Sequence, residues 1–174
     1  MSLPPPSTLT LIFGAIGAGK SHLSARIAER DRALVLATDK WFERLYLDDM
    51  PNPPELSWVL DRIKRCEEQI WAVALQAIAL AIPVILDIGL ATRSARAAYH
   101  DRCIDAALDH QFVFVHAPVQ VRIERVVMRN AARDATGDLY VSNDVFRATD
   151  AMFEEPSSEE LARLRAAVFS GRLG

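Results

Sequence analysis

Residues 14–21 constrain this chain more than any other segment, because they place three glycines, a lysine and a serine at fixed spacing. Glycine allows the backbone to turn sharply and to approach a bound group closely. The apolar run 9–13 precedes the segment, and a helix-like stretch from His22 to Arg30 follows it. A strand, a glycine-rich turn and a helix form the context in which the pattern G-x-x-x-x-G-K-S binds phosphate.

This segment, the phosphate loop (residues 14–21), offers an anion several donors. Its backbone N–H groups and the following helix N-terminus point at the anion, and the helix dipole adds to them. Lys20 can reach the β- and γ-phosphates of a nucleotide, and the Ser21 hydroxyl can take one position on Mg²⁺. A chance glycine-rich turn beside a surface lysine is the alternative, but it leaves the flanking strand and helix unexplained. We predict that a nucleotide binds at Gly14, Ala15, Gly17, Ala18, Gly19, Lys20, Ser21 and His22.

Composition and charge narrow the class of protein. Of 174 residues, 51% are hydrophobic and 25% charged, as in a single globular domain with a substantial core. The net charge of −3 and the lack of a basic run argue against a nucleic-acid partner. The apolar stretch 70–82 contains Gln76 and is too short to span a membrane. Residues 1–7 have no features of a signal peptide, so we expect a cytoplasmic protein without membrane partners.

Strand-like and helix-like segments alternate along the chain. Short apolar runs are typical of buried parallel strands, and longer stretches show helical periodicity. We predict strands at 8–13, 33–37, 83–87 and 111–115, and helices at 19–31, 41–47, 57–81, 92–110, 118–129, 143–153 and 157–169. The proline-rich segment 48–57 and the polar segment 130–142 are predicted to be irregular. The alternation predicts an α/β fold, in which a parallel sheet carries helices on both faces.

Two carboxylates follow predicted strands at the edge where such sheets bind ligands. Asp39 comes after the second strand, where a carboxylate can orient an acceptor hydroxyl and receive its proton. Capping of the next helix is an alternative role for Asp39. Asp87 ends the third strand, where it can hold Mg²⁺ together with Ser21. The alternative for Asp87 is a bond to backbone amides of the phosphate loop.

Arginines recur in and beyond the predicted helix 118–129, at positions 122, 125, 129 and 133. Arg125 and Arg129 are four residues apart and therefore share one helix face. A solvated face is the usual meaning of such a run. Beside a phosphate loop, however, Arg129 can neutralise charge on a transferring group, and the segment 130–142 can act as a lid that excludes water. Arg93 and Arg96 follow Asp87 and can serve an anionic acceptor.

The ordered set of motifs resembles the small P-loop kinases of the zeta-toxin and chloramphenicol-phosphotransferase type. The resemblance covers about residues 8–160. It rests on the phosphate loop, Thr38-Asp39, and the segments 84–89, 125–129 and 153–159. It implies a P-loop NTPase fold with strand order 2-3-1-4-5. It also implies transfer of the γ-phosphoryl group of ATP, with Mg²⁺, to the hydroxyl of a small molecule.

Residue by residue, the resemblance implies that Lys20 and Ser21 hold phosphates and magnesium and that Asp39 is the base. Arg125 corresponds to an arginine that lies against adenine, and Arg129 to one that reaches the phosphates. Glu154 and Glu159 match a terminal motif, to which we assign only helix capping and packing. The family often carries an arginine three residues after the base, whereas this chain has Phe42 there and its nearest arginine is Arg44. Our acceptor-site candidates are Arg44, Arg93 and Arg96.

The C-terminal part departs from the family. After Phe169 there is no room for a convincing fifth strand, and only 166–169 could serve as one. The adenine-side loop that usually follows this strand is expected to be absent or shortened. Two other functions stay open: a regulatory module that binds ATP without a dedicated acceptor, and a polynucleotide 5′-hydroxyl kinase, which the acidic charge disfavours.

Overall fold

A parallel sheet of five strands forms the centre of the structure, a computed structural model that describes residues 3–136 and 140–170. In chain order the strands are β1 (Leu9–Phe13), β2 (Leu34–Ala37), β3 (Val84–Asp87), β4 (His110–His116) and β5 (Ala167–Ser170). Their order in the sheet is β2-β3-β1-β4-β5. The α/β class and the strand order implied by the resemblance are therefore confirmed. β2 and β5, each four residues long, form the two edges.

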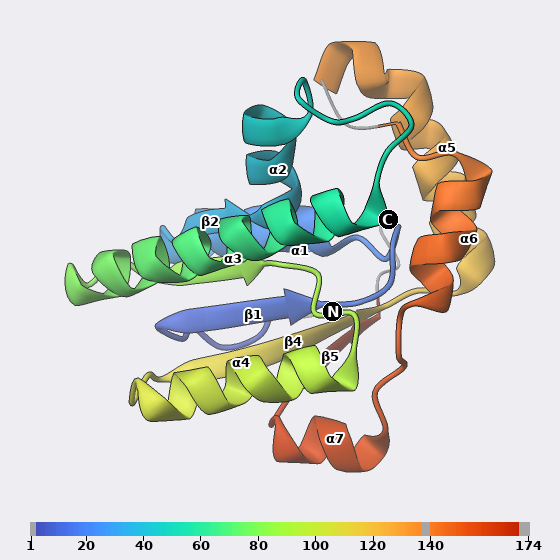
Figure 1. The fold of residues 1–174 in the computed structure, drawn as a ribbon. Helices are drawn as coiled ribbons and strands as arrows, with labels where there is room; N and C mark the ends of the chain where they lie inside the picture. Colours follow the sequence, from blue (N-terminus) through green and yellow to red (C-terminus); the bar gives the residue numbers. More distant parts are fainter. Residues whose placement is uncertain (1–2, 137–139, 171–174) are drawn as a thin grey trace.

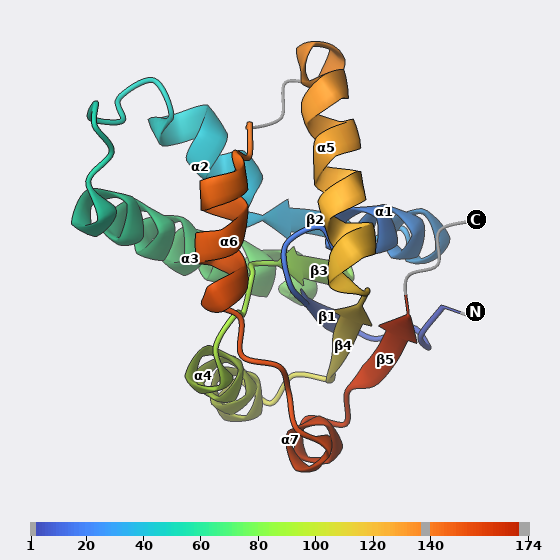
Figure 2. The ribbon, with the colours of Figure 1, turned by 90° about the vertical axis from the view of Figure 1, so that its right-hand side faces the viewer.

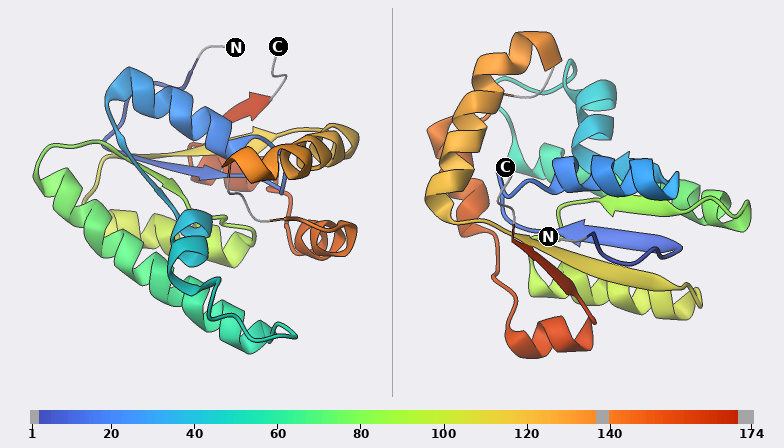
Figure 3. Two further views of the ribbon diagram at one scale, coloured as in Figure 1. Left: turned by 90° about the horizontal axis from the view of Figure 1, so that it is seen from above. Right: turned by 180° about the vertical axis from the view of Figure 1, so that it is seen from behind.

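Helices cover both faces of the sheet (Figure 3). All five residues of the central strand β1 are buried, and they alternate between two cores. Leu9, Leu11 and Phe13 pack in the core beneath α3 (Leu56–Ala79) and α4 (Arg93–Asp105). Ile12 packs on the other face, against α1 (Lys20–Asp31). The apolar runs of the sequence thus produce strands that are buried on both sides.

Two helices, α5 (Val119–Thr136) and α6 (Asn143–Ala151), stand beyond the carboxyl ends of the strands (Figure 1). Figure 2 looks onto this edge of the sheet and shows the turn from β1 into α1 between the two helices. α2 (Thr38–Tyr46) follows β2 at the same edge. The loops and helix ends that could carry chemistry are therefore gathered on one side of the molecule.

The C-terminal prediction was wrong in one element. The predicted helix 157–169 is a short helix, α7 (Ser158–Arg163), followed by a true fifth strand, β5. Arg165 adopts a positive φ of 49°, which ends the helical path, and β5 then pairs in parallel with β4. A four-residue edge strand is too short to show a strand pattern in the sequence. The predicted absence of the adenine-side loop concerns residues 171–174, which lie outside the described residues.

Several helix boundaries also differ from prediction. α4 ends at Asp105 rather than at residue 110, since Ala107 adopts a positive φ of 51° and β4 begins at His110. α2 begins at Thr38, immediately after β2, rather than at residue 41. α5 continues to Thr136, so the first part of the segment 130–142 is helical rather than irregular, and 137–139 lie outside the described residues. Alanine-rich polar sequence continues a helix as readily as it forms a loop. None of the helices in the described residues combines the length and the apolarity needed to span a membrane.

Candidate active site

The phosphate loop approaches other backbone segments so closely that only glycine fits. A Cβ atom on Gly14 would lie 2.3 Å from the carbonyl oxygen of Val115 in β4. At Gly17, where φ is 75°, a Cβ atom would lie 2.6 Å from the carbonyl oxygen of Arg122 in α5. Both contacts are with backbone, which cannot move aside as a side chain can. The glycine pattern thus seats the loop against β4 and α5.

Lys20, Ser21 and Asp87 meet where the loop enters α1. The ammonium group of Lys20 donates to the carbonyl oxygens of Gly14, at 3.0 Å, and Ala15, at 3.4 Å. The Ser21 hydroxyl donates to Oδ2 of Asp87 over 3.0 Å. Burial raises the pKa of Asp87, whereas the nearby Lys20 charge and the Ser21 hydrogen bond lower it in part. The two predicted metal ligands are therefore adjacent, as the magnesium prediction requires.

The chemistry of this pair fits Mg²⁺. Both groups offer oxygen, which is the donor that magnesium prefers, and magnesium commonly takes one or two protein ligands together with phosphate oxygens and water. Among the residues that the structure describes, no group of three or more His, Cys, Asp or Glu side chains could hold a metal ion.

Asp39 lies in the first turn of α2, at the same edge of the sheet as the phosphate loop. Ala37 occupies the N-cap position of that helix, without a side-chain cap hydrogen bond, so the capping alternative for Asp39 is not what the structure shows. Ala37, two residues before Asp39, pairs with Asp87 across β2 and β3, and the charge of Asp39 contributes, after burial, to the raised pKa of Asp87. Since Asp39 is also exposed, its carboxylate can reach a bound molecule.

Two arginines of α5, Arg122 and Arg125, bind the phosphate loop, and Arg129 lies one turn further along the helix. Arg125 donates to the carbonyl oxygen of Ala18 over 2.8 Å. Arg122 donates to the carbonyl oxygen of Ile16 over 3.2 Å and to Asp150 of α6 over 2.5 Å. The Nε atom of Arg129 is buried and has no hydrogen-bond partner among the described residues. Arg122 was absent from our predicted site residues, since its acceptors are backbone atoms and a distant carboxylate.

The three acceptor-site candidates differ in exposure. Arg44 on α2 and Arg93 at the start of α4 are exposed. Arg96 is 0% exposed and forms an ion pair of 2.7 Å with Glu160, which is 2% exposed. The Arg96 guanidinium also donates to the carbonyl oxygens of Leu90 and Ala91. Arg96 therefore supports the chain that leaves β3, and the prediction that it binds an acceptor is corrected.

One glutamate of the terminal motif has the capping role that we assigned to it. Glu154 accepts a hydrogen bond of 2.6 Å from the backbone N–H of Arg93, and so caps the start of α4. Glu160, which follows Glu159 of the matched motif, is the buried partner of Arg96. The pair is separated by 64 positions in the chain, and no local pattern could have identified it.

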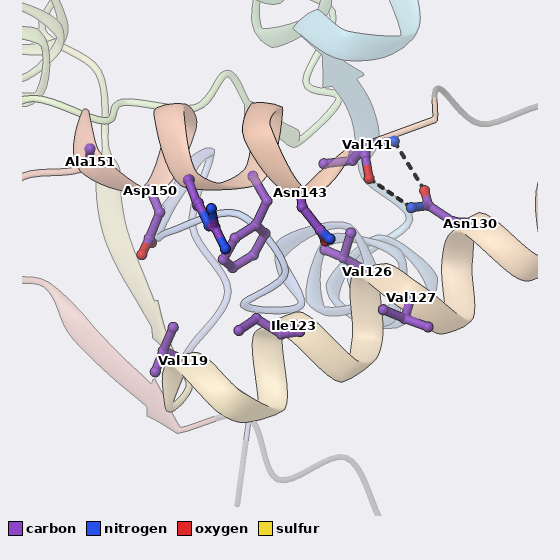
Figure 4. Close-up of a pocket in the computed structure, with 11 residues that line it drawn as sticks. Val119, Ile123, Val126, Val127, Asn130, Val141, Asn143, Asp150 and Ala151 are labelled. Atoms are coloured by element: carbon purple, nitrogen blue, oxygen red, sulfur yellow. Dashed lines mark hydrogen bonds between the residues drawn. The ribbon is translucent and has the colours of Figure 1, made fainter.

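A groove of about 480 Å³ lies between α5 and α6 (Figure 4). Apolar side chains such as Ile123, Val127 and Phe146 line it, and no phosphate-loop residue is among the described residues at its walls. At one end, the Asn130 side chain donates to the Val141 carbonyl and accepts from the Val141 N–H. These two bonds join the ends of the segment that we expect to act as a lid. The groove itself is separate from the nucleotide loop.

Comparison with known proteins places this geometry in a family. The profile of a family described as "AAA domain" matches residues 9–156, which include the phosphate loop, Asp39, Asp87 and the α5 arginines. The chain belongs to this AAA domain family. No curated protein matches the chain. The family match does not establish the narrower resemblance to zeta toxin and chloramphenicol phosphotransferase, and that resemblance stays a prediction.

Solved structures show that this AAA domain protein has the P-loop kinase fold. The APS kinase of Mycobacterium tuberculosis, in complex with AMPPNP and APS, has a TM-score of 0.62 at 18% identity, with 98% of this chain and 92% of that chain covered. A gluconokinase of Sinorhizobium meliloti has 0.57 at 19%, covering 97% and 85%. The shikimate kinase of Acinetobacter baumannii, with shikimate, has 0.52 at 16%, covering 97% and 86%. At these identities the similarity concerns the fold.

Proposed function

We propose that this protein is an ATP-dependent phosphotransferase that moves the γ-phosphoryl group of ATP to a hydroxyl of a small molecule. The observation that carries the proposal is the gathering of the phosphate loop, the Ser21–Asp87 pair and Asp39 at one edge of the sheet. A nucleotide-binding module needs the loop and the metal ligands, whereas a transferase also needs a group that orients the acceptor hydroxyl and receives its proton, and the exposed carboxylate of Asp39 meets that need. Similar structures that are described as kinases support the same conclusion.

In the proposed reaction, each residue of the site has its own role. The loop amides and Lys20 hold the phosphates, and Asp39 orients the acceptor hydroxyl and receives its proton. Bound at Ser21 and Asp87, Mg²⁺ would neutralise charge on the phosphates. Arg129, whose Nε has no hydrogen-bond partner among the residues that the structure describes, would stabilise the transferring group, and Arg125 would lie against the adenine. Closure of the lid over 130–142 would exclude water as a competing acceptor.

The acceptor side is proposed to lie between α2 and the start of α4, where Arg44 and Arg93 are exposed. An acceptor that carries a negative charge would suit these arginines. The acidic net charge of −3 makes a small molecule a better candidate than a polynucleotide. We further propose that the reaction takes place in the cytoplasm, where ATP is abundant.

Phosphoryl transfer from γ-labelled ATP with Mg²⁺ tests the proposal. The acceptor panel includes sugars, nucleosides, nucleotide-sugars, aminoglycosides, chloramphenicol and short oligonucleotides, and wild type is compared with Asp39→Asn and Lys20→Ala. A labelled small molecule formed only by wild type supports the proposal and gives the acceptor class. A labelled oligonucleotide would favour a polynucleotide kinase. Binding of ATP without product, or slow hydrolysis unchanged in Asp39→Asn, would favour a regulatory module.

A further inference from the structure

Two arginines of α5 donate hydrogen bonds to backbone carbonyl groups of the phosphate loop. Arg122 and Arg125 are three residues apart, so they project from one face of the helix. Arg122 donates to the carbonyl oxygen of Ile16, at 3.2 Å, and Arg125 to that of Ala18, at 2.8 Å. Lys20 takes the earlier carbonyls, those of Gly14 and Ala15. Arg125 also donates to the carbonyl oxygen of Gly17, at 3.5 Å, so side chains bind five carbonyl groups of the loop, those of residues 14–18.

Holding a carbonyl group also fixes the next amide. A peptide unit is planar and trans, so its C=O and its N–H point in opposite directions. When Arg122 binds the Ile16 oxygen, the N–H of Gly17 must point away from Arg122. The Arg125 bond to Ala18 fixes the N–H of Gly19 in the same way. The N–H of Ala18, in contrast, is used inside the loop, since it donates to the Ala15 oxygen over 3.1 Å.

Arg122 is built to hold this arrangement rigidly. Its side chain is 10% exposed, and its Nε also donates to the carbonyl oxygen of Ala117, at the end of β4. The carboxylate of Asp150 on α6 accepts a second bond from Nη1 over 2.5 Å. The Arg122 guanidinium also lies over the ring of Phe146, 5.7 Å from the ring centroid. The guanidinium therefore joins β4, the phosphate loop and α6 through one planar group.

We propose that Arg122 is a positioning residue that presets the Gly17 amide for a phosphate, and that Asp150 makes this setting depend on the position of α6. The inference rests on the proposed function only in that the loop binds nucleotide phosphates. It assigns no contact between Arg122 and the nucleotide, since Nε and Nη1 of Arg122 already donate to backbone oxygens and Asp150. Because α6 follows the lid segment, the position of α6 and the affinity of the loop for phosphate are linked through this side chain.

Binding measurements separate this role from a purely structural one. We compare wild type with Arg122→Ala, Arg122→Lys, Asp150→Ala and the matched control Arg147→Ala, an exposed arginine on α6. Isothermal titration gives the affinities for Mg²⁺-ATP and for inorganic tripolyphosphate. We expect Arg122→Ala to weaken both by about tenfold to a hundredfold. Arg122→Lys should recover part of the lost affinity. The affinity of Asp150→Ala should be several-fold lower than that of wild type, and the affinity of Arg147→Ala should equal it.

The amide resonance of Gly17 provides a direct readout. In wild type its proton should move downfield when tripolyphosphate is added, and this shift should shrink in Arg122→Ala and Asp150→Ala. Unchanged affinities and an unchanged Gly17 shift in folded Arg122→Ala would overturn the inference and leave the proposed function intact. Should Arg122→Ala not fold, Asp150→Ala with unchanged affinity has the same consequence. If wild type binds neither ATP nor tripolyphosphate, the proposed function itself is wrong.

Discussion

Asp87 is a buried carboxylate whose charge is costly in the folded protein. Burial raises its pKa, which means that the ionised form is stabilised less in the fold than in the unfolded chain. Replacement by asparagine keeps an acceptor for Ser21 and removes that charge. We expect Asp87→Asn to raise Tm by a few degrees and to lower Mg²⁺-dependent transfer by at least about a hundredfold.

Calorimetry with and without Mg²⁺-ATP checks both parts of this prediction. The Ser21→Ala variant is the matched control, because it should lose Mg²⁺ dependence without the gain in stability. A variant Asp87→Asn that melts below wild type in the absence of nucleotide would show that the carboxylate stabilises the fold, contrary to our account.

Glu67 on α3 makes stability depend on pH. Burial raises its pKa to about 7, although Arg102 lowers it in part. Between the ordinary value of 4.5 and about 7, the folded state holds a proton that the unfolded state has lost. The contribution of Glu67 to stability is therefore greatest below this window and is lost as pH rises through it. At pH ~8 we expect the free energy of unfolding of Glu67→Gln to be higher than that of wild type by about 1 kcal/mol. This figure allows for the partial exposure of the side chain.

Urea unfolding of wild type and Glu67→Gln at several pH values tests this prediction. The difference between the two proteins is informative, since it cancels the opposite contribution of His100, whose pKa is lowered by burial and by the neighbouring His110. A difference that does not change between acid and alkaline pH would contradict the role of Glu67.

At the scale of residues, the sequence predicted the groups whose chemistry is local. The phosphate loop, Asp39 and Asp87 each follow a strand directly, so their place at the sheet edge is fixed by the chain itself. The position of Arg96 could not be inferred, because its partner Glu160 is brought close only by the packing of α4 against the C-terminal segment. An arginine and a glutamate far apart in sequence give no sign of whether they face water or each other.

At the scale of elements, the Arg96–Glu160 pair holds the chain between β3 and α4 in place. Both side chains are buried, and Arg96 also binds the carbonyl groups of Leu90 and Ala91. Removal of one partner leaves the other charge buried without compensation. We expect Arg96→Ala to lower the free energy of unfolding by about 3–5 kcal/mol, measured by urea denaturation.

A double variant distinguishes the lost charge pair from lost packing. Arg96→Met combined with Glu160→Met removes both charges and keeps apolar volume, so it should be closer to wild type than Arg96→Ala is. If the double variant is as unstable as the single one, the bonds from Arg96 to the Leu90 and Ala91 carbonyl groups contribute more to stability than the ion pair does.

The elements that were predicted wrongly are those determined by tertiary pairing. β5 gains its hydrogen bonds from β4, with Val113 opposite Ala167 and His116 opposite Ser170. Its sequence, with Arg165 and Ala166 before it, continues the preceding helical pattern and gives little sign of the change. At the extended end of α5, Asn130 forms two hydrogen bonds with Val141, a contact between segments that the local sequence does not reveal.

At the scale of the whole molecule, nucleotide binding should stabilise the entire fold. The phosphate loop bonds or packs against β4, α5 and, through Arg122, α6. A ligand present at about 100 times its Kd adds about 2.7 kcal/mol to the free energy of unfolding. For a chain of this size we expect Tm to rise by about 5–10 °C.

Differential scanning calorimetry with Mg²⁺-ATP tests this prediction, and Lys20→Ala serves as the control that should show little shift. A wild-type Tm that does not respond to saturating Mg²⁺-ATP would argue against nucleotide binding at the loop.

The overall architecture was predictable because the alternation of apolar runs and helices specifies a parallel sheet, whereas the strand order came from the resemblance.

The short edges of the sheet have a consequence for the behaviour of the protein in concentrated solution. An edge strand presents unpaired N–H and C=O groups, on which another molecule can add a strand and begin aggregation. Here β2 and β5 contribute only four residues each. So few backbone groups give an incoming strand little to bind, even though Leu34 and Val168 are partly exposed. Preparations at high concentration should therefore resist growth into fibrous assemblies.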